Sequence, residues 1–167
     1  SSTLLGDGRV LVAGGLDPTR TGEQESSSAE VYDPSTGQWS STGSMVQKHS
    51  RHNAALLRDG RVLVAGTYSA EVYDPSTGTW SLAGKPLRER DQGFPMTVLG
   101  DGRVLVVGGE IHTGGWTGIY APIKNVDIYD PSTGTWSAAS PMAEPYKLHP
   151  ATLLKDADVF FFDEPSS

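Results

Sequence analysis

The chain contains no cysteine among its 167 residues, so it cannot form a disulfide, a thiolate metal site or a cysteine nucleophile. It also lacks any apolar run that approaches the roughly 20 residues needed to span a bilayer as a helix. Acidic residues outnumber basic ones, and the formal net charge of -7 argues against nucleic acid or an anionic membrane as a partner. Any binding or catalytic site of this chain must therefore use side chains other than cysteine.

Several motifs that carry chemistry are also missing. No Gly-x-Ser-x-Gly nucleophile turn occurs, and the pairs Gly108-Gly109 and Gly114-Gly115 do not form a phosphate-binding pattern. No stretch shows apolar residues at the i, i+3, i+4 spacing of a helix. Apolar residues are nevertheless interleaved regularly with the 20 glycines and 11 prolines, which is not the composition of a disordered tail. We therefore expect a turn-rich β protein.

Two sequence segments recur along the chain. Gly-Asp-Gly-Arg-Val-Leu-Val-Ala-Gly-Gly at 6–15 returns with small changes at 58–67 and 100–109. Val-Tyr-Asp-Pro-Ser-Thr-Gly-Gln-Trp-Ser at 31–40 returns in the same way later in the chain, at 72–81 and 128–137. Internal repetition of this kind is typical of folds in which each unit buries its faces against its neighbours.

Each repeat is interpreted as four short strands, named a to d. In the second repeat they are expected at 53–57, 61–65, 70–73 and 79–82. An Asp-Gly pair between a and b predicts a two-residue hairpin in which both central residues have positive φ. Asp-Pro-Ser-Thr-Gly between c and d predicts a turn in which aspartate bonds its own backbone and glycine is left-handed. Strand b is apolar throughout, which predicts burial on both faces.

The repeats divide one continuous segment, 1–167, without a second domain. Their approximate bounds are 1–45, 46–87 and 88–143, followed by a partial fourth repeat at 144–167. The fourth repeat starts with a strand a at 151–154. After that strand, Asp-Gly is replaced by Asp156-Ala157, the glycine pair is missing and no strand c or d follows.

These residues resemble the kelch repeat, with its glycine pair after strand b, its tyrosine in strand c and its tryptophan in strand d. The run DGRVLVAGG…AEVYDPSTGTWS is similar to repeats of galactose-oxidase-type propellers and of secreted bacterial kelch proteins. The resemblance implies an all-β fold of kelch-type β-propeller blades, in which Trp39, Trp80 and Trp136 pack between blades. It also favours an extracellular or cell-surface bacterial location, although the sequence leaves the compartment open.

The number of repeats bears on how such a fold closes. Propellers have typically about 4–8 blades, whereas this chain carries three complete repeats and a partial fourth. We therefore expect a segment of a larger propeller, completed by additional blades or by self-association. Open blade faces would otherwise expose apolar surface.

The variable parts of the repeats are expected at one end of the strands. Antiparallel strands place the a–b and c–d turns at one end and the b–c loops and d–a crossovers at the other. The turns are short and nearly identical, whereas the b–c loops at 16–28 and 110–125 and the crossovers at 44–52, 85–94 and 142–149 vary. A constant frame with variable loops is typical of a scaffold that carries function on those loops.

The candidate binding residues lie in these variable segments. Trp116 and Tyr120 lie off the repeat in the 110–125 loop, where aromatic side chains supply contact area for interfaces or sugar-like ligands. A loop that folds over its own blade is the alternative for Trp116, and the sequence does not decide between the two. The remaining candidates are cationic or imidazole side chains: Arg51, His52, Arg90, His112 and His149.

Neither a metal site nor a catalytic group is assigned. The histidines fall in crossovers or in the third b–c loop, but none of their spacings is typical of a metal cluster, so we expect no metal and no cofactor. Aspartates such as Asp7 and Asp33 belong to the repeat turns and are interpreted as structural. Copper-radical oxidases of the galactose-oxidase type need a cysteine crosslinked to a tyrosine, which this chain cannot supply.

The sequence therefore favours a non-catalytic interaction module whose b–c and d–a loops bind a protein or a carbohydrate-like ligand. The alternative is a fragment of a propeller oxidase or lyase whose catalytic residues lie in other blades, because propellers host binding modules and enzymes alike. A structural repeat segment within an assembly is a third hypothesis.

Overall fold

The computed structural model describes residues 1–17, 24–113, 118–145, 151–153 and 159–161, the last two ranges as backbone strands only. No helix occurs in these ranges, and hence none that is long and apolar enough to cross a membrane. The all-β prediction is thus confirmed. The chain divides into two compact units, Ser1–Lys85 and Pro86–Ser167, each considered by itself.

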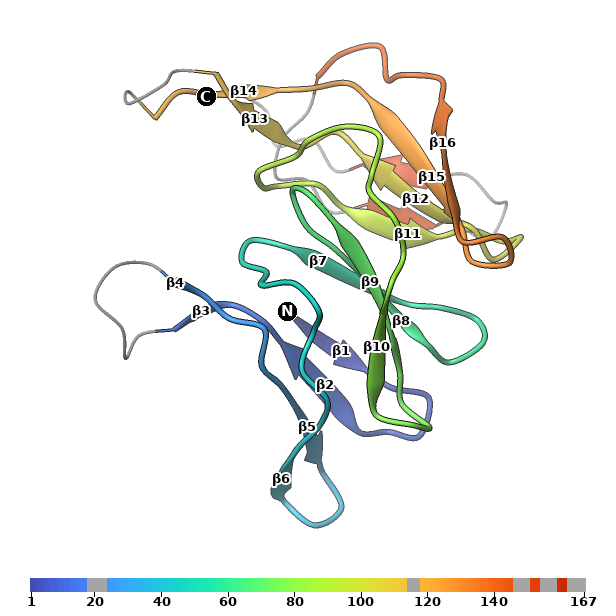
Figure 1. Ribbon diagram of the computed structural model, residues 1–167. Coiled ribbons are helices and arrows are strands. Elements are labelled where there is room, and N and C mark those ends of the chain that lie inside the picture. The colour runs from blue at the N-terminus through green and yellow to red at the C-terminus, as the bar shows by residue number, and fades with distance from the viewer. Residues whose placement is uncertain (18–23, 114–117, 146–150, 154–158, 162–167) are drawn as a thin grey trace. The chain divides into compact units, whose positions relative to one another are not determined.

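Unit Ser1–Lys85 contains two four-stranded antiparallel sheets, blades 1 and 2 (Figure 1). Blade 1 has the order β1-β2-β5-β6, formed by Ser2–Leu4, Val10–Ala13, Ala29–Asp33 and Gln38–Ser41. Blade 2 has the order β7-β8-β9-β10, formed by Asn53–Leu56, Val62–Ala65, Ala70–Asp74 and Thr79–Leu82. Both blades follow the predicted order of strands a, b, c and d, and the strands of blade 2 begin and end within one residue of the predicted bounds.

Unit Pro86–Ser167 contains blade 3, a sheet of the same order (Figure 1). Its strands are β11 (Met96–Val98), β12 (Val104–Val107), β15 (Val126–Asp130) and β16 (Thr135–Ala139). A further hairpin pairs β17 (Ala151–Leu153) with β18 (Val159–Phe161), and β17 lies beside β11. The partial fourth repeat therefore contributes strand a and a partner strand.

Two b–c loops contain strands that the sequence did not predict. In blade 1, β3 (Leu16–Asp17) pairs with β4 (Gln24–Glu25). In blade 3, β13 (Glu110–His112) pairs with β14 (Tyr120–Pro122). These strands are two or three residues long and lie outside the repeated pattern, so no repeat signature marks them. The longer loops are thus ribbons that extend from the blades.

The a–b turns differ from the predicted two-residue hairpin. The Leu5 amide donates to the Arg9 carbonyl at 2.8 Å and the Gly8 amide donates to the Leu5 carbonyl at 3.1 Å, which makes a three-residue loop. Among the residues of this turn, only Gly8 has positive φ (89°). The Asp7 side chain instead accepts a hydrogen bond from the Arg9 amide at 3.0 Å. The turn is a type I turn followed by a left-handed glycine, one of the common hairpin loops. The prediction of two positive φ values was therefore wrong.

The c–d turns follow the prediction. Asp33 Oδ1 accepts hydrogen bonds from the amide and the hydroxyl of Ser35 at 2.8 and 2.6 Å. The Gly37 amide donates to the Asp33 carbonyl at 2.8 Å, and Gly37 is left-handed with φ of 70°. The Ser35 hydrogen bonds lower the pKa of Asp33, which is the behaviour of a turn carboxylate that must stay ionised to keep its donors.

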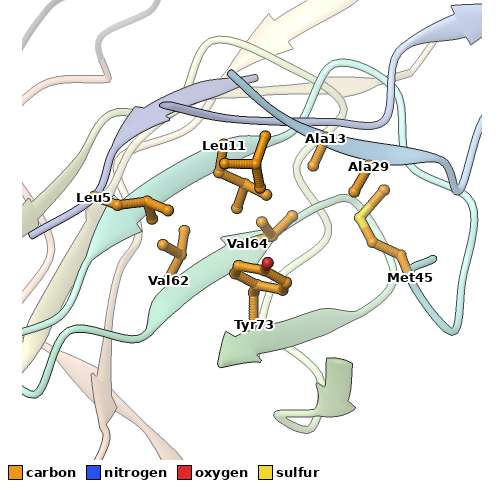
Figure 2. Close-up of a cluster of buried hydrophobic side chains, with 9 residues drawn as sticks. Leu5, Leu11, Ala13, Ala29, Met45, Val62, Val64 and Tyr73 are labelled. Carbon is orange, nitrogen blue, oxygen red and sulfur yellow. The ribbon is translucent and has the colours of Figure 1, made fainter. Parts of the chain in front are cut away.

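The core of the first unit lies between the facing sides of blades 1 and 2. Figure 2 shows its side chains pointing toward one another from both sheets. The buried cluster comprises Leu5, Leu11, Ala13, Ala29, Val31, Met45, Val62, Val64 and Tyr73. Every residue of β8 is fully buried, which confirms the expected burial of this strand on both faces. Because side chains alternate along β5, Glu30 and Tyr32 face away from blade 2.

The tryptophans of strand d differ in their surroundings. Trp80 is half-buried against the core cluster, and its Nε1 donates to the Gly43 carbonyl in the preceding crossover at 2.7 Å. Trp39 stacks on Tyr32 with ring centroids 5.0 Å apart but is 54% exposed. The prediction that Trp39 packs between blades is wrong in this structure, because its indole is largely exposed.

Candidate functional site

The variable segments gather at one end of the blades within each unit. In the first unit a β-bridge joins Ser26 of the b–c loop to His49 of the d–a crossover. In the second unit a bridge joins Gln92 of the crossover to Glu110 of β13. At the opposite end of blade 1, the turns at 7–9 and 33–35 line a common depression. The predicted separation of constant turns from variable loops is therefore present in both units.

The glycines after strand b allow each crossover to lie directly on the strand end. A Cβ added to Gly14 would lie 2.6 Å from the His49 carbonyl oxygen, and one added to Gly66 would collide with the His49 imidazole. A Cβ added to Gly109 would lie 2.9 Å from the Phe94 Cβ. The glycine after strand b thus lets the crossover lie close to the strand backbone, in addition to adopting backbone conformations that other residues disfavour.

A buried carboxylate anchors the first crossover. Glu71 on β9 is fully buried, and it accepts the backbone N–H groups of Val46 and Gln47 at 2.7 Å each. Its Oε1 also lies 3.1 Å from His49 Nε2. A buried carboxylate is tolerated when several hydrogen-bond donors surround it, as they do here. The crossover is therefore held rigidly against blade 2.

The arrangement around His49 is structural. Its Nε2 contacts Glu71 Oε1 at 3.1 Å and Ser69 Oγ at 3.5 Å. A serine–histidine–acid relay instead uses the two different ring nitrogens, one for the acid and one for the hydroxyl. With both partners on one nitrogen, His49 cannot accept the Ser69 proton while it donates to Glu71.

The second crossover is anchored by Arg90. Its Nη1 donates to Asp127 Oδ2 at 2.7 Å, and its Nε donates to the Gly108 carbonyl at 2.8 Å. Asp127 is the second residue of its strand c, as Glu71 is, so blades 2 and 3 use the same position to hold a crossover. Arg90 is only 1% exposed, so the structure places it inside the unit and away from the surface at which the sequence analysis had placed it.

His52 is also buried. It is 8% exposed, and its Nε2 lies 2.8 Å from Ser1 Oγ while its Nδ1 has no hydrogen-bond partner. Burial lowers the pKa of the His52 imidazole to about 4. The side chain is therefore neutral near pH 7. Its neighbour Arg51 is exposed and has a left-handed backbone with φ of 51°.

The structure brings two predicted candidates together on the β13–β14 ribbon. His112 and Tyr120 are paired across the two strands, with ring centroids 5.2 Å apart in an edge-on arrangement. The His112 amide donates to Asp91 Oδ2 at 2.6 Å, which ties the ribbon to the crossover. Ile119 beside them is 57% exposed. Trp116 and His149 lie outside the described residues.

Sequence reasoning missed a pocket in the first unit. It has a volume of about 480 Å³ and is lined by Glu25, residues 46–50 and residues 67–69. The b–c turn of blade 2 is short and was not among the predicted binding segments, yet it carries Tyr68, which is 66% exposed. An aromatic residue at a position without a counterpart in the repeat was the signal available in the sequence.

No group of three or more histidine, cysteine, aspartate or glutamate side chains in the described ranges is placed to share a metal ion.

Comparison with known protein families identifies the fold. The kelch motif matches residues 2–46 and 97–143, which together make up more than half of the sequence. The chain belongs to the kelch family.

Solved structures agree with this kelch assignment. YjhT shares 19% sequence identity at a TM-score of 0.75, over 93% of this kelch chain and 56% of YjhT. A fungal alcohol oxidase of the AA5 family, solved in complex with copper, shares 21% identity at a TM-score of 0.60, over 81% of this chain and 29% of the oxidase. No curated protein matches the chain. The kelch chain thus spans about half of YjhT, and these likenesses show the fold alone.

Proposed function

We propose that this kelch chain is a binding module without chemistry of its own, which presents its b–c and d–a segments to a protein or a carbohydrate-like ligand. The proposal rests on one contrast: buried side chains hold the backbone of the crossovers, whereas other side chains at the same end of the blades are exposed. Glu71 and the Arg90–Asp127 pair hold the crossovers from inside. Tyr68 and His112, which have no counterpart in the repeat, are exposed on the b–c segments beside these crossovers. A rigid frame with variable outward groups suits recognition.

The opposite end of the blades offers little scope for specificity. Its turns are nearly identical, and their charged groups are paired with one another, as in the ion pair between Arg9 and Asp7 at 2.7 Å. The same pairing recurs between Arg61 and Asp59 at 2.7 Å. A ligand at that end would meet the same surface on successive blades.

Tyr120 of the β13–β14 ribbon and Trp116, from the same b–c loop in sequence, provide the test of the proposal. The full chain is screened on glycan and peptide microarrays, and each ligand found is titrated against wild type, Trp116→Ala, Tyr120→Ala and the opposite-end control Arg9→Ala. Loss of an aromatic anchor is expected to weaken binding by at least about tenfold with an unchanged melting temperature. Binding that depends on Arg9 but on neither aromatic residue would contradict the proposal.

A part of a propeller enzyme is the second candidate function. The likeness to a copper-bound alcohol oxidase favours it, since that enzyme uses the same fold. The absence of cysteine means that this chain cannot contribute the cysteine of a cysteine–tyrosine cofactor. Copper content and alcohol oxidation, measured on the longest natural protein that contains this sequence, would distinguish the two candidates. Stoichiometric copper with turnover would favour the enzyme.

A further inference from the structure

A pocket of about 480 Å³ opens in unit Ser1–Lys85 where segments of two blades meet. Glu25 from the blade 1 ribbon, the crossover at 46–50 and the turn at 67–69 of blade 2 form its lining. Small-molecule sites typically occupy roughly 300–1,000 Å³, so the volume is that of a site for a ligand of one or two rings.

Tyr68 gives this pocket an aromatic surface. The side chain is 66% exposed, and its ring has no counterpart in the other repeats. Lys85 Nζ lies 5.8 Å from the ring centroid, a cation–π contact that restrains the ring without covering it. A restrained tyrosine offers a flat apolar surface with a polar tip, which matches the C–H face and hydroxyl rim of a sugar ring.

The rest of the lining is rich in hydroxyl and amide groups. Ser50 Oγ donates to Glu25 Oε1 at 2.5 Å, and Gln47, Thr67 and Ser69 complete a set that can both donate and accept. One carboxylate, from Glu25, and one ammonium group, from Lys48, line the pocket. The buried Glu71 carboxylate beneath the wall offsets the Lys85 ammonium group over the Tyr68 ring, so the charges around the pocket balance. A balanced polar lining favours a neutral polyhydroxylated ligand over an anionic one.

The wall of the pocket is organised before any ligand binds. Glu71 fixes the backbone of Val46 and Gln47 from beneath and orients the buried His49 imidazole. Gly66 leaves room for that imidazole, since a Cβ at this position would collide with its Nδ1. A wall held by buried hydrogen bonds loses little conformational entropy on binding, which favours measurable affinity for a small ligand.

We propose that this pocket binds a neutral saccharide, with one sugar ring stacked on Tyr68 and its hydroxyl groups bonded to Glu25, Gln47 and Ser50. The inference rests on the proposed function and names the ligand class for one part of the binding surface. It places that ligand within unit Ser1–Lys85, on segments of blades 1 and 2.

The test uses the full chain and a panel of neutral methyl glycosides and disaccharides, together with their uronic-acid counterparts. Binding is measured by saturation-transfer difference NMR and titration calorimetry. At least one neutral saccharide is expected to bind, and Tyr68→Ala is expected to weaken it by about tenfold or more. Tyr68→Phe should keep affinity within about threefold, because the stacking surface remains. Arg9→Ala, at the opposite end of blade 1, serves as the control and should leave this affinity unchanged.

The outcomes separate the pocket from the wider proposal. Absence of any neutral saccharide binding, or preference for the uronic acids, would overturn the pocket assignment. A saccharide whose affinity falls with Tyr120→Ala but not with Tyr68→Ala would also overturn it, while still supporting a binding module. If peptides bind through Trp116 or Tyr120 and saccharides do not bind, the binding module stands and the pocket assignment fails. If neither class binds, both fail.

Discussion

Glu71 Oε1 lies 3.1 Å from Nε2 of His49, and the same carboxylate accepts two backbone N–H groups of the crossover that carries this histidine. Asp127 and Arg90 make the corresponding connection in the second unit at 2.7 Å. In blades 2 and 3 the second residue of strand c thus fixes a crossover to its blade. The crossovers and b–c loops form the proposed binding end. A substitution at this position of strand c would therefore change both the stability of the blade and the shape of the binding surface.

Glu71→Gln should destabilise the chain by about 2–4 kcal/mol, since an amide cannot accept from both backbone N–H groups and leaves a buried donor unpaired. Glu30→Gln is the matched control, because Glu30 occupies the same place in blade 1 and is exposed. Urea denaturation followed by intrinsic fluorescence would measure both changes. Equal effects of the two substitutions would show that Glu71 does not anchor the crossover.

Trp80→Ala should cost about 2–3 kcal/mol, somewhat less than the loss of a fully buried tryptophan, because the indole is half-buried and donates to the Gly43 carbonyl. Trp39→Ala should cost less than about 1 kcal/mol, since Trp39 is 54% exposed. Melting temperatures and denaturant midpoints of the two variants provide the comparison. A larger loss for Trp39 would mean that its surroundings in solution differ from those described.

Gly109→Ala should destabilise the second unit by at least about 2 kcal/mol. Its φ of 98° is strained for alanine, and the new Cβ would lie 2.9 Å from that of Phe94. Gly100→Ala is the control, because a Cβ at Gly100 would meet nothing within 4 Å. Hydrogen exchange of blade 3 amides would locate the effect. Unchanged protection in Gly109→Ala would contradict the role assigned to the glycine pair.

Stability should fall as the pH drops from about 6.5 to about 4, because burial lowers the pKa of folded His52 to about 4 from its ordinary value of 6.5. Within that window the unfolded chain binds a proton that the folded chain does not, so acid favours unfolding by on the order of 2–3 kcal/mol. His52→Gln should flatten this dependence, whereas the exposed His112→Gln should not. Parallel slopes for wild type and His52→Gln would contradict the prediction.

The amino-acid sequence by itself determined the four strands of each complete repeat, their order and most of the turns, but not the short strands of the two longer b–c loops. Strand alternation, the Asp-Pro-Ser-Thr-Gly turn and the glycine pair act within a few residues of one another, so their repetition is visible without any tertiary contact. The exception among local features was the a–b turn. There the Asp7 side chain bonds the Arg9 amide and adds one residue to the loop, a choice between two turns that Asp-Gly serves equally well.

Only the tertiary structure decided which copies of a repeated residue are buried. Trp39 and Trp80, like Glu30 and Glu71, occupy equivalent positions, yet only the second of each pair meets a crossover from a preceding blade. Arg90 resembles a surface cation in sequence and becomes an internal anchor because Asp127, far along the chain, lies opposite it. Burial and the shape of the Tyr68 pocket depend on neighbours supplied by other strands and loops, and that information is absent from any local pattern.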